Sequence, residues 1–163
     1  MKKPLLFGAV LVMLWGCDSK PPTTPTVPDT DGSGSFSGTI NSVPWTATAD
    51  SVKAIRTAVA STQFVNVLIA GTDATLIGVS CTTRTLDIAT TYDVASGAVT
   101  CTVTQGPATW EASQTAFSSD GTVTFTTLTT SRAVGNYAFY AVPAANSSAT
   151  GTKLVSGVFD LKF

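Results

Sequence analysis

Hydrophobic and polar residues alternate along most of the chain after residue 36, in short stretches separated by turn-forming residues. The last stretch is the clearest, because apolar positions recur at every second residue: Val155, Gly157, Phe159, Leu161 and Phe163. A period of two places successive side chains on opposite faces of a β-strand. The pattern predicts strands at 36–40, 45–49, 52–60, 64–70, 75–81, 86–94, 99–104, 108–113, 122–127, 134–142 and 155–163.

Turn residues separate these strands, and the sequences Asn-Ser-Val-Pro at 41–44 and Gly-Thr-Asp at 71–73 are examples. Only 52–60 has an alternative, because residues 53–56 also suit a helix. About nine to eleven short strands with regular turns are typical of an antiparallel β-sandwich or a flattened barrel. We therefore expect an all-β domain over residues 36–163.

Large aromatic residues on the predicted strands supply the bulk of a hydrophobic core: Trp45, Trp110, Tyr137, Phe139, Phe159 and Phe163. The two tryptophans could instead line a binding cleft. Core packing is the interpretation we favour, because aromatic side chains bury large areas on folding.

The first 16 residues predict a secretory signal peptide rather than part of the domain. Lys2 and Lys3 precede an apolar run at 5–16, which is too short to span a bilayer. Its end, Leu-Trp-Gly-Cys, resembles the lipobox of bacterial lipoproteins, in which the cysteine becomes the lipidated N-terminus; Trp15 departs from the usual small residue. We expect lipidation at Cys17, with a plain signal peptide cleaved elsewhere as the alternative.

Residues 17–35 predict a disordered linker between the lipidated cysteine and the domain. The segment contains four of the eight prolines and ends in Gly and Ser. About sixteen such residues hold a domain on the order of 50 Å from a bilayer. Residues 29–34, Asp-Thr-Asp-Gly-Ser-Gly, also suggest a calcium loop, but the bidentate Glu of such loops does not follow. We expect no metal site.

Composition excludes several classes of function. The formal net charge is −1, which does not suit a nucleic-acid-binding protein, and no histidine is present for catalysis or metal ligation. Removal of Lys2 and Lys3 leaves seven basic against ten acidic residues. A mildly acidic chain is not attracted to anionic lipid, so we expect the anchor rather than the domain surface to hold the protein at the membrane.

Cys81 and Cys101 form the remaining even pair of cysteines. Each shares strand parity with apolar neighbours, so both thiols face the same side of the predicted sheet. An exported protein lies in an oxidising compartment, and a disulfide is therefore expected. A redox or nucleophilic cysteine is the alternative, but Arg84 is the only nearby cation in the sequence to stabilise a thiolate.

The search for catalytic motifs yields little. The chain has no CxxC motif and no glycine-rich phosphate loop before a helix. Asp87, Asp93 and Glu111 are the carboxylates worth considering as a catalytic set, and their strand parity points them to solvent. We therefore expect a protein that is not an enzyme and uses no cofactor.

Three stretches resemble an uncharacterised group of bacterial β-domain lipoproteins, common in the Bacteroidetes. They are GTINSVPWTATA at 38–49, GTVTFTTL at 121–128 followed by VGNYAFYA at 134–141, and GVFDLKF at 157–163; Ser42 stands where the group usually has Gly. The resemblance implies an all-β domain of unknown function and supplies no catalytic residues.

These observations together predict a lipid-anchored cell-envelope protein, on the periplasmic face or the cell surface. Its β-domain is expected to be a non-enzymatic interaction or structural module whose membrane contact is the lipid on Cys17. The alternative is a small apolar-ligand binder with a calycin-like barrel, since closed barrels of about eight strands can hold one small ligand.

Overall fold

The computed structural model describes residues 33–116 and 119–163. The predicted signal peptide, Cys17, and all but the last three residues of the predicted linker lie outside the described residues, as does most of the calcium-loop alternative. Within the described ranges the regular elements are strands, and no helix long and apolar enough to cross a membrane is found there. The strands are β1 (Gly34–Ile40), β2 (Val43–Thr46), β3 (Lys53–Ala58), β4 (Val65–Thr72), β5 (Ile77–Thr85), β6 (Thr91–Asp93), β7 (Val99–Gln105), β8 (Ala108–Ala112), β9 (Asp120–Leu128), β10 (Arg132–Pro143) and β11 (Lys153–Lys162).

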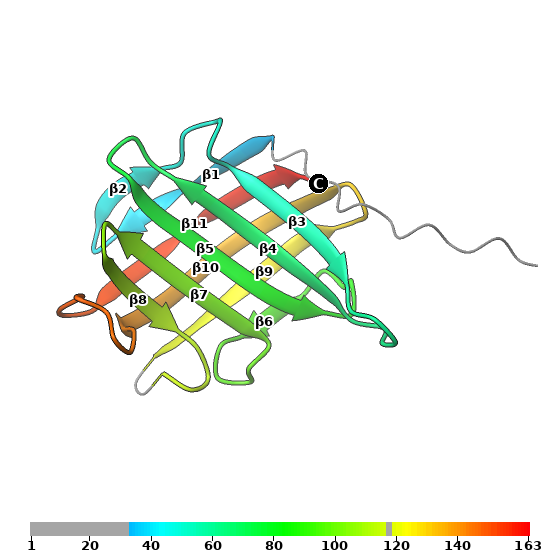
Figure 1. Ribbon diagram of the computed structural model, residues 1–163. Helices are drawn as coiled ribbons and strands as arrows, with labels where there is room; N and C mark the ends of the chain where they lie inside the picture. The colour runs from blue at the N-terminus through cyan, green and yellow to red at the C-terminus, as the bar shows by residue number, and fades with distance from the viewer. Residues whose placement is uncertain (1–32, 117–118) are drawn as a thin grey trace, which may run out of the picture.

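All strand pairs are antiparallel, and the strands form one curled sheet with two layers. Layer A has the order β6-β9-β10-β11-β1-β2, and layer B has the order β8-β7-β5-β4-β3. The strands of one layer run across those of the other (Figure 1). The prediction of an all-β antiparallel sandwich or flattened barrel is confirmed.

The two layers are joined at two corners. At one corner, the long strand β10 pairs with β9 over most of its length, but its last residues pair with β8, Val142 opposite Glu111. At the other corner, the segment after β2 crosses between the layers. There the Ala47 amide donates to Phe36 O of layer A at 2.9 Å, and the Thr48 amide donates to Thr72 O of layer B at 2.9 Å.

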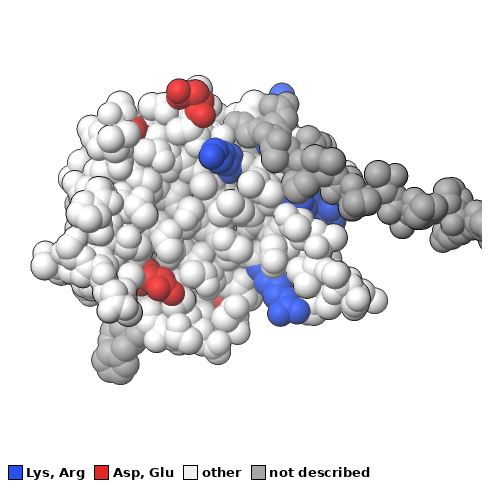
Figure 2. Space-filling model, viewed as in Figure 1, with Lys and Arg blue, Asp and Glu red and all other residues white. Residues whose placement is uncertain are grey.

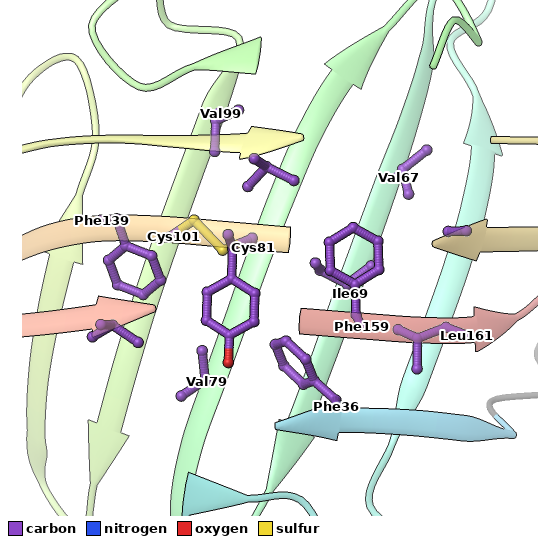
Figure 3. Close-up of a cluster of buried hydrophobic side chains, with 14 of the residues drawn as sticks. Phe36, Val67, Ile69, Val79, Cys81, Val99, Cys101, Phe139, Phe159 and Leu161 are labelled. Carbon is purple, nitrogen blue, oxygen red and sulfur yellow. A yellow bond between two sulfur atoms is a disulfide. The ribbon is translucent and has the colours of Figure 1, made fainter. Parts of the chain in front are cut away.

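The core lies between the layers and follows the alternation of the sequence. In β10, for example, every second residue from Ala133 to Ala141 is buried. Figure 3 shows part of this cluster, with Phe36, Phe139 and Phe159 of layer A and the Cys81–Cys101 disulfide of layer B. The six aromatic residues expected in the core are all buried, as predicted, and Trp45 also borders a surface cleft at the edge of the core.

Several strand boundaries differ from the prediction. Residues 53–56 lie in β3, so the strand assignment is correct there and the helical alternative is wrong. β5 continues to Thr85, past the predicted end at residue 81, because its threonines pair with β4 and β7 and β-branched residues favour strands. Of the predicted strand at 86–94, only residues 91–93 form a strand, β6. The left-handed backbone of Asp87, with φ of 65°, interrupts the extended conformation before it. The strand predicted at 45–49 ends at Thr46.

Candidate functional site

A surface cleft lies at one end of the sandwich, where the two layers meet. It has a volume of about 380 Å³. Its walls come from the β1–β2 hairpin, from the β4–β5 turn, and from the ends of β7 and β11. We call it the rim cleft, and it is lined by Ile40, Asn41, Val43, Pro44, Trp45, Asp73, Thr75, Ile77, Gln105 and Lys153.

The hairpin wall of the rim cleft is held by a tight turn at Asn41 and Ser42. Both residues have left-handed backbones, with φ of 50° and 67°. This is the type I′ geometry that matches the twist of paired strands. The Asn41 side chain also fixes the turn to β11, because its Oδ1 accepts the Leu154 amide at 2.7 Å.

The opposite wall is an Asx-type turn built by Asp73. One carboxylate oxygen of Asp73, Oδ1, accepts the amides of Thr75 at 2.8 Å and Ile77 at 2.9 Å. The indole of Trp45 then donates to the Ile77 carbonyl at 3.0 Å, which ties layer A to layer B at the floor of the cleft. Asp73 thus shapes the cleft, and its accepting oxygens face its own turn.

Lys153 is the cation that lines the rim cleft. Its ammonium nitrogen lies 4.3 Å from the centroid of the Trp110 ring, a cation–π contact. Trp110 is itself held by its indole N–H, which is 3.3 Å from the carbonyl oxygens of both Thr150 and Gly151. The cleft therefore combines an apolar wall with amide, hydroxyl and ammonium groups, the mixture that small-molecule and peptide sites use.

Two further hollows are present on the surface. A shallow one of about 190 Å³ lies on the outer face of layer B and is lined mainly by small residues and hydroxyls, including Gly78, Ser80 and Thr102. The Ser80 and Thr102 hydroxyls lie 2.8 Å apart, so they satisfy each other. A cleft of about 380 Å³ is bordered by Glu111 and by the segment after β10. The first has no wall from layer A among the described residues that line it, and the second lies where β8 and the end of β10 meet, without a cation in its lining.

The structure does not bring together the three carboxylates that sequence reasoning considered. Asp87 forms a bidentate ion pair with Arg56, whose Nε donates to Asp87 Oδ1 at 3.1 Å, and the hydrogen bond raises the pKa of Arg56. Because of this pair, Asp87 is half-buried rather than pointing freely to solvent as predicted. Asp93 accepts the Ala95 amide at 2.6 Å in its own turn. Within residues 33–116 and 119–163, no three His, Cys, Asp or Glu residues are grouped so that they could hold a metal ion.

Cys81 and Cys101 form a disulfide, as predicted. They lie directly opposite each other on β5 and β7, and both are fully buried in the core. A buried bridge of this kind stabilises the domain and is inaccessible to a substrate.

Sequence reasoning missed the rim cleft, because its residues come from four segments far apart in the chain. The local signal was Asp73 followed two residues later by Thr75, which is typical of an Asx turn. No protein-family model matches this chain, and no curated protein or solved structure is significantly similar to it.

Proposed function

We propose that the protein is a lipid-anchored module of the cell envelope that binds a partner at the rim cleft and catalyses no reaction. The anchor part rests on the Leu-Trp-Gly-Cys sequence ending at Cys17 and on the Pro-rich segment that follows. The binding part rests on the structure of the domain.

The position of the rim cleft relative to the start of the domain carries this proposal. The chain begins the domain at Ser33, whose carbonyl accepts the Lys162 amide at 2.9 Å. β1 then crosses the whole layer, and its last residue, Ile40, lines the rim cleft. A partner can therefore reach the cleft at the end of the domain opposite the attachment point.

The chemistry of the cleft favours a partner that presents an apolar group with hydrogen-bonding atoms beside it. Val43 is 64% exposed at the mouth, and Pro44 and Ile77 extend the apolar wall. Asn41 and Gln105 provide amides at the border. A protein or peptide side chain of this type would bury Val43 and leave the polar border hydrated.

Two experiments test the proposal. Cys17→Ser should release the protein from the membrane fraction, because the acyl chains supply the anchor.

Val43→Glu should reduce capture of the envelope partner by about tenfold, since a charge would be buried against an apolar group. Val158→Glu is the matched control, because Val158 is 56% exposed on the outer face of layer A. Equal capture by both variants would contradict binding at the cleft.

A small apolar ligand is the second candidate occupant of the same cleft. A volume of about 380 Å³ is within the size range of small-molecule sites. The space between the layers is occupied by the large side chains of Phe36, Phe125, Tyr137 and Phe159, so the ligand would bind at the rim rather than inside a barrel. Because Trp45 lines the cleft, its fluorescence should change when an apolar probe is added to the wild-type protein but not to Val43→Glu.

A further inference from the structure

The end of the domain opposite the rim cleft carries exposed apolar side chains. Phe64 follows the β3–β4 turn. Val65 is opposite Thr85 in the pairing of β4 with β5, so the preceding residue, Phe64, lies beside Leu86. Leu86 is 45% exposed and Ile88 is 52% exposed. We call these three residues, Phe64, Leu86 and Ile88, the apolar end. Large apolar side chains grouped at one end of a domain indicate a contact surface.

One cation lies against the apolar end, and a second lies in the same half of the domain. The Arg84 guanidinium lies 4.5 Å from the centroid of the Phe64 ring, and Lys162 is exposed near the end of β11. Arg56 and Arg132 also lie in this half of the domain, where their charges are balanced by the ion pairs with Asp87 and Asp160. Arg84 and Lys162 therefore leave this half with positive charge in excess.

The other half has the opposite charge. Asp50, Asp73, Glu111 and Asp120 lie at its strand ends and turns, against the two cations Lys53 and Lys153, so negative charge is in excess there. Figure 2 shows the same division on one face of the molecule, with most blue side chains in the right-hand half and the larger red areas in the left-hand half. The domain thus has a charge gradient along its length, although its net charge is small.

The start of the domain coincides with the positive half. Ser33 is hydrogen-bonded to Lys162, and the Phe163 amide donates to Ser131 O at 3.2 Å, so both ends of the described domain lie together. The C-terminus, the β3–β4 turn and the end of β5 are all on the right-hand side of Figure 1. A chain anchored through residues that precede Ser33 would enter the domain on this side, and a linker that spans at most about 50 Å would leave this side free to reach the bilayer.

We propose that the apolar end docks on a bilayer surface that contains anionic phospholipid headgroups, with the rim cleft facing away. This inference rests on the lipid anchor of the proposed function. Phe64, Leu86 and Ile88 would insert at the headgroup level, and Arg84 and Lys162 would be attracted by the lipid phosphates. The acidic half would be repelled, which orients the domain. The sequence predicted no such attraction because it shows net charge and not the distribution of charge.

The test uses the lipidated protein, extracted from membranes and returned to vesicles of phosphatidylglycerol with phosphatidylcholine or of phosphatidylcholine alone. A photo-crosslinking amino acid replaces Leu86 in one variant and Leu76 in the matched control. Leu76 is 75% exposed on the β4–β5 turn, at the rim-cleft end. A third variant carries the crosslinker at Ile88, so the result does not depend on the folding of one substitution.

The proposal predicts phospholipid adducts about tenfold more abundant at positions 86 and 88 than at 76, with a marked decrease in vesicles without anionic lipid and at high salt. Equal yields at the two ends would overturn it, and so would protein adducts in place of lipid adducts at position 86. The mass of the N-terminal peptide reports lipidation separately. If the chain carries no lipid, the protein is added to the same vesicles from solution. The ratio of lipid adducts at positions 86 and 88 to those at 76 then tests the docking of the apolar end without the anchor.

Discussion

The two layers of the sandwich are stabilised in different ways. Layer A contributes six large aromatic side chains to the core: Phe36, Trp45, Phe125, Tyr137, Phe139 and Phe159. Layer B contributes one, Trp110, and otherwise presents valines, alanines, threonines and Ile69 together with the Cys81–Cys101 disulfide. Layer A depends on the fit of large rings, whereas layer B depends on small residues and a covalent bridge. The rim cleft has walls from both layers, so its shape depends on both.

The fit in layer A is tight where the Tyr137 side chain packs over two glycines. Tyr137 is opposite Gly157 on β11, and Gly157 is opposite Gly38 on β1. The Tyr137 hydroxyl donates to the Ser37 carbonyl at 3.1 Å, and burial raises the pKa of Tyr137. A Cβ on Gly157 would lie 2.5 Å from the Tyr137 hydroxyl oxygen and 2.1 Å from Ser37 O. Only glycine leaves room for the ring at this position.

Gly157→Ala should therefore give the largest loss of stability, about 3 kcal/mol or more, because backbone and a buried ring must both move. Urea denaturation measures it. Gly151→Ala is the matched control, since a Cβ there meets nothing within 4 Å and the positive φ of 64° costs only about 1 kcal/mol. Similar losses in the two variants would contradict the account of layer A.

The disulfide of layer B should give the next largest effect. Replacing both Cys81 and Cys101 with Ala should lower the free energy of unfolding by about 2–4 kcal/mol and leave a folded domain. Thermal unfolding with and without reductant measures this. If the double variant were as stable as the wild type, layer B would be held by its small side chains alone.

Thr83 offers a substitution of opposite sign in the same layer. Its hydroxyl is buried between Val67 and Val99 on the neighbouring strands and has no hydrogen-bond partner among the residues that the structure describes. Thr83→Val keeps the shape and removes the unpaired oxygen, so stability should rise by about 1 kcal/mol. A decrease on urea denaturation would show that the hydroxyl has a partner in solution, such as a buried water.

Ser42→Gly should give the smallest effect, at the hairpin wall of the rim cleft. Ser42 has a φ of 67°, which glycine adopts without the steric cost that Cβ imposes. We expect a gain of about 0.5–1 kcal/mol in thermal or urea unfolding, with the cleft unchanged. A loss of stability would mean that the Ser42 side chain contributes more than its backbone costs.

The fold was accessible from the sequence because alternation in strands such as β10 and β11 is strict and the cysteines share the parity of their apolar neighbours. The end of β5 could not be predicted from the sequence, since Thr83 and Thr85 are polar residues buried on the inner face. The rim cleft was not predictable either. Val43, Asp73 and Lys153 become neighbours only when the layers fold over each other, and no local pattern encodes that crossing.

The proposed function requires the domain to bind a partner at the end where the two layers meet. The most direct measurement is site-specific photo-crosslinking in intact cells, with the crosslinker at Val43 in one variant and at Val158 in the other, both exposed. The account predicts one discrete adduct from position 43 and none from position 158. The same adducts from both positions, or a discrete adduct from position 158 alone, would contradict it.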